Sequence, residues 1–313
     1  MTVPLVSIVV PVFNGEDLVG DCIESLLAMD YPVDRREIIV VDNNSADRTG
    51  EVIRRYPVIG CFEPTPGPAA ARNAGIAMAR GETIAFTDHD CVVGTAWARE
   101  IERSFTDPQT LAVQGFAEGI NANLFAEVAQ RRWEDWWFDS TSNGLTLKRN
   151  GVDTRNCALR KNAFDLCGLF NVEYLHCQDI ALGMQLTAAG ITVVGNPNMR
   201  VAHRNLTSLA VALKKNRTRT PYVIKLIRNP PPGMTRDDLP LPRSAFFGLA
   251  ERKLRGISGA VMLHGARLCR RLILYAFRLC LAVRLRHRLT VKLYKIYYGI
   301  SYDLAIIESR REL

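Results

Sequence analysis

The stretch Ile84-Ala-Phe-Thr-Asp-His-Asp90 is a short apolar run that leads directly into two carboxylates one residue apart. A run of this length predicts a buried strand, with Asp88 and Asp90 at its carboxyl end. Two carboxylates at this spacing can share a hard divalent cation, because each supplies oxygen ligands. The same residues can also do no more than cap a turn, so the surrounding sequence has to decide between the two interpretations.

Strands and helices alternate along the chain up to this stretch. The β-branched run Val6–Val12 is typical of a buried parallel strand. The expected strands are residues 6–12, 37–41, 58–61 and 83–86, and the expected helices are residues 16–29, 46–55 and 69–79. This alternation predicts an α/β fold with a mostly parallel sheet and helices on both faces. Ligands bind such sheets at the carboxyl ends of the strands, where Asn14, Asp42 and Asp88 are expected to meet.

The second half of the chain is less regular. It is expected to hold a Trp-rich helix over about 120–139, a strand at 156–160, a helix over 178–189 and a strand at 199–203. Trp133, Trp136 and Trp137 have helical spacing, which predicts a core face, with a platform for an acceptor sugar as the alternative. The predicted divisions are a nucleotide-sugar-binding half (1–118), an acceptor-binding and catalytic half (119–228), a Pro-rich linker (229–242) and a basic helical segment (243–313).

Positive charge is concentrated in that last segment. The net charge of the chain is +8, and residues 243–295 hold 13 Lys and Arg against one acidic residue. As a helix, residues 267–283 would carry arginines on one side and apolar residues on the other. This pattern predicts an amphipathic helix on an anionic membrane surface, with an ordinary core-facing helix as the alternative. A nucleic-acid partner is not expected, because the segment is rich in apolar residues and lacks a recognisable reader fold.

The composition indicates a globular protein of the cytoplasm. The chain has 313 residues, of which 48% are hydrophobic, which is enough for a substantial core. The start of the sequence lacks a basic n-region and carries Pro4, so no secretory signal is expected. No 18-residue window is apolar and uncharged, so no spanning helix is expected. The eight cysteines are then expected to be reduced thiols. The predicted location is cytoplasmic and peripheral, at the inner face of the cell membrane.

A set of short motifs follows in order along the chain. They are Ser7-Ile-Val-Val-Pro-Val-Phe-Asn14, Val41-Asp-Asn-Asn-Ser-Ala-Asp47, Ala71-Arg-Asn-Ala-Gly75, Gly81, Asp88-His-Asp90, Asn156-Cys-Ala-Leu-Arg160, Gly168-Leu-Phe170, Gln178-Asp179 and His203. Together they resemble the family 2 glycosyltransferases, which have the Rossmann-like GT-A fold, over roughly residues 5–225. The resemblance implies transfer of a sugar from a nucleotide-diphosphate donor, with a UDP-sugar favoured, to an acceptor hydroxyl with inversion.

The resemblance also implies roles for particular residues. The residues expected to bind the nucleotide are Pro11, Val12, Phe13, Glu16, Asp42 and Arg72. Asp90 would be the direct ligand of Mn²⁺ or Mg²⁺, Asp88 would contact the ribose, sugar or metal, and His203 would approach the metal or diphosphate. Asp179 matches the position of the general base that deprotonates the acceptor. A basic helix would lie over the diphosphate and carry Lys214, Lys215, Arg217 and Arg219, of which Arg217 is the first choice.

Each of these residues also has a purely structural explanation. Asp179 can be a carboxylate that stabilises a helix N-terminus, and Asp42 can close an Asx-turn. Arg72 can be a solvated charge on a helix, Phe13 a core residue, and His203 a packed histidine.

Two features depart from the family pattern. Gln178 stands where the family usually has Glu, which leaves the predicted base intact but can change how the acceptor is oriented. The Gln-x-x-Arg-Trp signature of processive synthases is absent, which favours single additions to a glycan or lipid-linked acceptor.

Two other functions compete with a transferase. A sugar nucleotidyltransferase would need a Gly-rich, Lys-containing loop after the first strand, and Val12-Phe-Asn-Gly-Glu16 is not such a loop. A non-catalytic protein that keeps the sugar-nucleotide pocket is compatible with Gln178. Replacing Asp179 discriminates between catalysis and binding alone.

Overall fold

The computed structural model describes residues 5–120, 123–141, 152–205 and 208–229, together with isolated helical residues at 271–273, 275, 293 and 296–297. The chain divides into two compact units. The first comprises Met1–Asn121, Arg132–Asn205 and Asn229–Pro240, and the second comprises Ala122–Arg131, Leu206–Arg228 and Leu241–Leu313. The predicted linker over 229–242 and the basic segment over 243–313 lie outside the described residues, apart from Asn229 and the isolated residues above.

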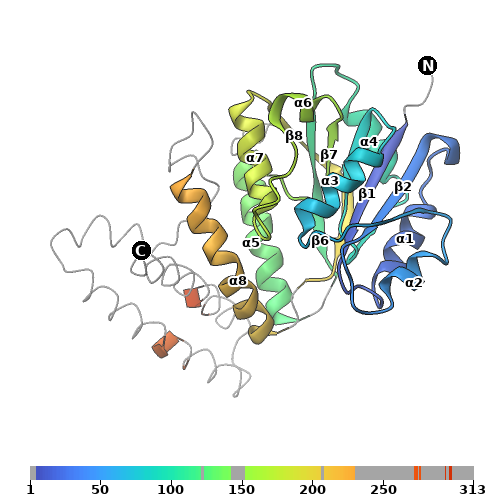
Figure 1. Cartoon of the computed structure of the whole chain (residues 1–313). Helices are drawn as coiled ribbons and strands as arrows, with labels where there is room; N and C mark the ends of the chain where they lie inside the picture. The colour runs from blue at the N-terminus through green and yellow to red at the C-terminus, as the bar shows by residue number, and fades with distance from the viewer. Residues whose placement is uncertain are drawn as a thin grey trace. The chain divides into compact units, whose positions relative to one another are not determined.

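The first unit is built on an eight-stranded sheet in the order β3-β2-β1-β4-β7-β6-β8-β5 (Figure 1). The strands are β1 (Val6–Val12), β2 (Arg36–Asp42), β3 (Ile59–Phe62), β4 (Thr83–Phe86), β5 (Cys91–Val93), β6 (Ala112–Gly119), β7 (Cys157–Arg160) and β8 (Val193–His203). The strands β3, β2, β1 and β4 are parallel, as the sequence predicts. In the other half, β7 runs antiparallel to both of its neighbours and β5 runs antiparallel to β8, so the sheet is mixed.

The helices lie on both faces of this sheet. The helical elements of the chain are α1 (Val19–Leu27), η1 (Val33–Arg35), α2 (Thr49–Ile53), α3 (Pro68–Met78), α4 (Trp97–Ser104), α5 (Leu124–Thr141), α6 (Ala163–Cys167), α7 (Gln178–Ala188) and α8 (Leu209–Arg228). Buried residues of α1, α2 and α4 pack into one hydrophobic cluster, and those of α3, α6 and α7 pack into the other. The alternation along β1 explains this division, because Ile8 and Val10 enter the first cluster while Val9 enters the second.

The second unit contains α8. Thr220, Val223 and Leu226 are buried at helical spacing, which gives this helix one apolar face. No described helix is long and apolar enough to cross a lipid bilayer. All six cysteines in the described part of the chain are free thiols, as expected.

A buried carboxylate joins the amino ends of β1, β2 and β4. The hydroxyl of Ser7 donates to Glu37 Oε1 at 2.5 Å and accepts from the Gly81 amide at 2.8 Å. Arg80 donates to Glu37 through its backbone amide at 2.6 Å and through Nε at 2.8 Å. A Cβ at Gly81 would lie 2.7 Å from the Leu5 carbonyl oxygen, so only glycine fits here. This end of the strands is opposite to the end where a ligand is expected.

Glu37→Gln should destabilise the fold in a pH-dependent way. Burial raises the pKa of Glu37, but the bonds from Ser7 and Arg80 outweigh burial and bring the pKa below its usual 4.5. The ionised form therefore supplies stability that is present above about pH 4.5 and is lost as the pH falls through the lower, folded-state pKa. We expect the variant to lose about 1–3 kcal/mol of unfolding free energy at neutral pH, and less in acid. Urea denaturation across this range measures the difference, with Glu51→Gln, an exposed carboxylate, as control. A difference that does not change with pH would contradict the assignment.

Candidate active site

Three loops leave the same edge of the sheet. Val12 at the end of β1 pairs with Asp42 at the end of β2, and Val9 of β1 pairs with Phe86 at the end of β4. Because these strands are parallel, the segments that follow them project from one edge. Asn14 and Asp88 follow β1 and β4, and Asp42 is the last residue of β2, so all three lie at the edge where the sequence predicts them.

The loops after β1 and β2 are fastened to each other. Asn14, in a left-handed conformation with φ of 48°, accepts from the Ala46 amide at 2.8 Å and donates its own amide to the Ser45 hydroxyl at 2.9 Å. Glu16 accepts from the backbone amide of Arg48 at 2.9 Å and pairs with its guanidinium at 3.1 Å. Residues 43–48 are therefore held as a loop, which explains why α2 begins at Thr49 and not at the predicted residue 46.

The predicted nucleotide-binding residues differ in what they expose. The Phe13 side chain is 59% exposed, so the alternative that it belongs to the core is wrong. Pro11 and Val12 are buried in β1. Asp42 is half-buried, and its Oδ1 accepts from the Ser45 amide at 3.1 Å, which is the turn that the structural alternative predicts.

Arg72 is buried against Asp88. Its side chain is only 2% exposed, and Nη2 donates to Asp88 Oδ1 at 2.6 Å. The alternative of a solvated helix charge is therefore wrong. A buried guanidinium requires an anion close by, and Asp88 supplies it. The Nε of Arg72 is buried and has no hydrogen-bond partner within the described part of the chain.

The Gly168-Leu-Phe170 motif packs on the same arginine. The Phe170 ring lies 5.7 Å from the Arg72 guanidinium carbon and 5.4 Å from the ring of Phe86. The side chain of Asn73 donates to the Phe170 carbonyl at 2.8 Å and accepts from its amide at 3.1 Å. These two bonds fasten the start of the 168–177 segment to α3, and Leu175 further along it packs against Gly67.

Asp179 lies in the first turn of α7 and is half-buried. Its Oδ1 accepts from the Ile180 amide at 2.9 Å, as a carboxylate at a helix N-terminus does. Burial raises the pKa of the Cys157 thiol, the charge of Arg72 opposes this, and Asp88 and Asp179 add to it. Asp179 is therefore within electrostatic range of the same thiol as the Arg72–Asp88 pair.

Asp90 contacts His203 at the end of β8. The distance from His203 Nε2 to Asp90 Oδ2 is 3.4 Å. Burial raises the pKa of Asp90, but the hydrogen bond from His203 and the charge of Arg155 outweigh burial and lower the pKa to about 2. Asp90 is therefore a carboxylate at neutral pH.

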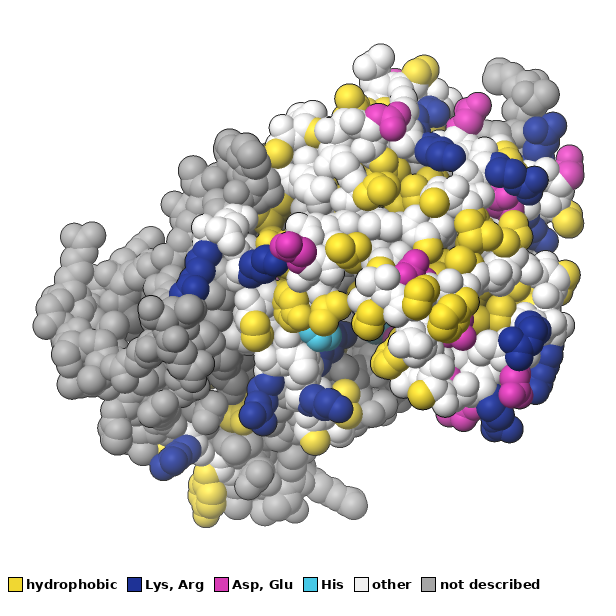
Figure 2. Space-filling model, in the orientation of Figure 1, with side chains coloured by type: hydrophobic (Ala, Val, Ile, Leu, Met, Phe, Trp, Pro, Cys, Tyr) yellow, Lys and Arg dark blue, Asp and Glu magenta, His cyan; other side chains and the backbone are white. Residues whose placement is uncertain are grey.

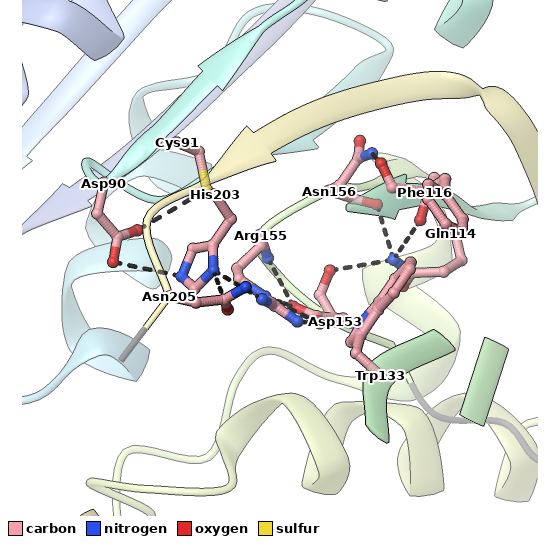
Figure 3. A network of polar contacts seen from close by, with 11 residues as sticks. Asp90, Cys91, Gln114, Phe116, Trp133, Asp153, Arg155, Asn156, His203 and Asn205 are labelled. Atoms are coloured by element: carbon pink, nitrogen blue, oxygen red, sulfur yellow. Dashed lines mark hydrogen bonds and ion pairs between the residues drawn. The ribbon is translucent and has the colours of Figure 1, made fainter. Parts of the chain in front are cut away.

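Behind His203 lies an ion pair that the sequence analysis missed (Figure 3). Arg155 Nε bonds both carboxylate oxygens of Asp153, at 2.9 and 3.0 Å, and Nη2 makes a further bond to Oδ2. Burial raises the pKa of Asp153, but the Arg155 charge outweighs burial and holds this pKa well below its usual range. The signal in the sequence is an Asp-x-Arg directly before the β7 strand.

Side-chain amides fix this ion pair to the sheet. Gln114 accepts from the Asp153 amide at 2.7 Å and donates to the Asn156 carbonyl at 2.9 Å. Asn156 donates to the carbonyls of Met199 at 2.7 Å and Phe116 at 2.9 Å, which spans the irregular register of β6 and β8 at Gly115/Phe116. The position of Arg155 is therefore set by three strands.

Of the three tryptophans of α5 predicted to form a core face, Trp137 is buried, and Trp133 and Trp136 are half-buried. Trp137 is buried and stacks on Trp133 with ring centroids 5.6 Å apart. Trp133 Nε1 donates to Asp153 Oδ2 at 2.7 Å, so this aromatic cluster also supports the ion pair.

The charge and apolar character of the surface are mixed. Figure 2 shows apolar side chains spread over one face of the described surface, with acidic and basic side chains interspersed among them. On the 168–177 segment, Leu169, Val172 and Leu175 are 41–48% exposed. The basic residues Lys214, Lys215 and Arg217 of α8 are exposed. Because α8 belongs to the other compact unit, its place over a diphosphate stays a prediction.

The described residues contain no group of three or more His, Cys, Asp or Glu side chains arranged around a metal position. The donor set nevertheless fits a hard cation that shares its shell with a ligand. Asp90 is an ionised carboxylate that is 29% exposed, and its oxygens are the ligands that Mg²⁺ and Mn²⁺ prefer.

The fold and the site together define an α/β protein with carboxylates at the carboxyl ends of its parallel strands. Residues 7–167 match the profile of glycosyl transferase family 2. This match covers about half of the chain, and the chain belongs to that family.

Curated relatives and solved structures agree with this assignment. The chain is 27% identical over 198 residues to the glycosyltransferase AglE of Haloferax volcanii, covering 61% of this chain and 64% of that protein. It is 34% identical over 137 residues to a poly(ribitol-phosphate) beta-glucosyltransferase of Bacillus spizizenii, covering 39% of this chain and 21% of that protein. The chain thus matches less than two thirds of the length of each relative.

Two solved structures have a similar fold. The mannosyltransferase PcManGT of Pyrobaculum calidifontis, in complex with GDP-Man and Mn²⁺, has a TM-score of 0.65 at 19% identity, over 99% of this chain and 89% of that one. TarS 1–349 of S. aureus with UDP-GlcNAc has a TM-score of 0.55 at 14% identity, over 98% and 92%. At these identities the likeness supports the GT-A fold.

A double-mutant cycle on Arg72 and Asp88 tests whether this pair is structural. Asp88→Asn strands a buried guanidinium and should lower the unfolding free energy by about 3 kcal/mol. Arg72→Met leaves an Asp88 that is 27% exposed and can be hydrated, so the loss should be smaller. The double variant should lose less than the sum, with a coupling of about 0.5–3 kcal/mol in urea denaturation. A gain in stability from Asp88→Asn would instead mean that its repulsion of Asp90 dominates, which contradicts the pairing.

Proposed function

We propose that this protein is a metal-dependent, inverting glycosyltransferase that moves one sugar from a nucleotide-diphosphate donor to an acceptor hydroxyl. The observation that carries the proposal is the set of carboxylates around one sheet edge. The ionised Asp90 and the Arg72-paired Asp88 follow β4, next to the ends of β1 and β2, in a chain of glycosyl transferase family 2. Asp179, in the first turn of α7, and Asp88 both raise the pKa of the buried Cys157 thiol.

The nucleotide would bind on the loops after β1 and β2. The exposed ring of Phe13 offers a stacking surface for the base. The backbone at Pro11 and Val12 and the carboxylates of Glu16 and Asp42 would contact the ribose and base. Because Arg72 is buried, its contribution to base binding would be indirect, through Asp88.

A divalent cation, Mn²⁺ or Mg²⁺, would be held by Asp90 and by the donor diphosphate, and would supply charge neutralisation for the leaving group. Asp88 precedes Asp90 by two residues, and His203 contacts Asp90, so both would lie close to this cation. The Lys and Arg of α8, with Arg217 as first choice, would add positive charge at the diphosphate.

Asp179 would act as the general base. In a single displacement, the acceptor oxygen bonds to the anomeric carbon while the bond from that carbon to the phosphate oxygen breaks. The acceptor proton passes to the Asp179 carboxylate, and the nucleoside diphosphate leaves with the bonding electrons. Attack from the face opposite the leaving group inverts the anomeric configuration.

The acceptor is proposed to be a glycan precursor or a lipid-linked sugar, handled at the inner face of the cell membrane. Two relatives are named as glycosyltransferases of poly(ribitol-phosphate), which supports a polymeric acceptor. The exposed apolar residues 169, 172 and 175, which precede the candidate base in the sequence, are compatible with an acceptor that carries an apolar group. A UDP-sugar is our first choice of donor, and GDP-sugars are the second, because the neighbours bind both classes.

A non-catalytic protein of this family is the second candidate, and Gln178 is the observation that favours it.

Thermal denaturation with UDP, GDP, dTDP and CDP, each with and without Mn²⁺, tests donor binding. A specific diphosphate at about 100 times its Kd should add about 2.7 kcal/mol, and only with metal. Asp90→Asn should abolish this metal-dependent stabilisation by the nucleotide. Equal small shifts with all nucleotides would contradict a donor site.

Asp179→Asn separates catalysis from binding. The variant should keep nucleotide binding and lose about 10²–10⁴-fold in kcat, because the amide cannot accept the acceptor proton. The matched control is Asp165→Asn, another first-turn carboxylate, on α6, which is exposed and should leave kcat unchanged. Equal turnover by the wild type and Asp179→Asn would remove this residue from the reaction.

A further inference from the structure

His203 Nδ1 has two polar neighbours, and each requires a different tautomer of the ring. Arg155 Nη1 lies 3.0 Å from this nitrogen, and Asn205 Oδ1 lies 2.9 Å from it (Figure 3). An oxygen acceptor favours a proton on Nδ1, whereas an N–H donor favours a lone pair there. Only one of the two contacts can be satisfied by a neutral ring in a given tautomer.

Arg155 is the partner that cannot adapt. A guanidinium donates hydrogen bonds and has no acceptor atom, while a side-chain amide can turn over and present its NH₂ group in place of its oxygen. The contact at 3.0 Å therefore requires the lone pair on Nδ1, which leaves the ring proton on Nε2.

Arg155 is also held in place. Its guanidinium bonds both oxygens of Asp153, and its own backbone amide donates to Asp153 Oδ1 at 3.1 Å. Trp133 bonds the same carboxylate, and its ring lies 5.8 Å from the Arg155 guanidinium carbon. The Arg155 side chain is only 18% exposed, so moving it away from His203 would break several contacts at once.

The proton on Nε2 points to the candidate metal ligand. The distance from Nε2 to Asp90 Oδ2 is 3.4 Å, while Asp90 Oδ1 is approached by the Cys91 thiol, a weak donor, at 3.7 Å. A nitrogen that carries a proton has no lone pair for a metal. The donor and ligand roles of His203 therefore exclude each other.

We propose that Arg155 is a positioning residue that fixes His203 as the Nε2–H tautomer, so that His203 donates to Asp90 Oδ2 and orients this carboxylate instead of ligating the metal itself. The pair Asp153–Arg155 acts through His203 and does not touch the substrate. The inference about Asp90 rests on the proposed function, but the tautomer of His203 does not.

The test is ¹⁵N NMR of the full chain, labelled at histidine and free of metal. The His203 signals are assigned by comparison with His203→Gln, since the chain has five histidines. We expect Nδ1 at the shift of an unprotonated imidazole nitrogen and Nε2 at that of a protonated one. A wild-type spectrum with Nδ1–H, or with both nitrogens protonated at neutral pH, would overturn the proposal.

Two variants identify which neighbour decides. Asp153→Asn/Arg155→Gln removes both charges together, which avoids a stranded buried ion. It should shift the tautomer ratio towards Nδ1–H by about tenfold or more, the worth of a hydrogen bond to a charged group. The matched variant Asn205→Ala should keep the wild-type tautomer. An unchanged ratio in the double variant, or a switch in Asn205→Ala, would overturn the role of Arg155.

Adding Mg²⁺ with UDP or GDP to the same sample tests the second half of the proposal. The Nε2 proton of His203 should persist, because Asp90 and not the ring binds the cation. Loss of that proton on metal addition would show that His203 is a ligand. If the sample shows the expected tautomer but the ¹⁵N shifts do not change with either nucleotide, the proposed function is contradicted and the role of Arg155 is not.

Discussion

The buried guanidinium of Arg72 is the constraint on which the arrangement of α3 and the turn after β4 depends. A guanidinium that is 2% exposed needs a fixed anion, and Asp88 at 2.6 Å provides it. This requirement sets the approach of α3 to the turn after β4. Phe170 covers the guanidinium, and Asn73 on the same helix binds the Phe170 backbone. One electrostatic need thus brings together segments that lie about a hundred residues apart in sequence.

The two acidic residues after β4 contact different partners. Asp88 pairs with Arg72, and Asp90 contacts His203, which is backed by the Arg155–Asp153 pair. Two carboxylates one residue apart would repel each other if both faced the same space. Each carboxylate therefore has a partner of its own, and the surroundings of Asp90 lower its pKa to about 2.

The sequence predicts the strands β1, β2, β3 and β4 and the polar residues at their carboxyl ends, because buried strands and their polar ends leave a recognisable pattern. The reversed direction of β7 and β5 leaves no such pattern, since pairing direction depends on long-range contacts. The same holds for Arg72, which looks like a surface charge until β4 places Asp88 beside it. Arg155 was missed for a related reason. Its partners lie on β8 and α5 as well as two residues away, and a single Asp-x-Arg gives no sign of them.

The amide of Asn73 binds Phe170 with the same donor and acceptor pattern that a neighbouring strand would use. The Asn73 side chain thus takes the place of a strand and anchors one end of the 171–176 segment. The first turn of α7 anchors the other end. A segment anchored at both ends can change its length and composition without moving its anchors. The exposed residues Val172 and Leu175 of this segment can therefore be replaced without moving Asp179, which lies in the first turn of α7.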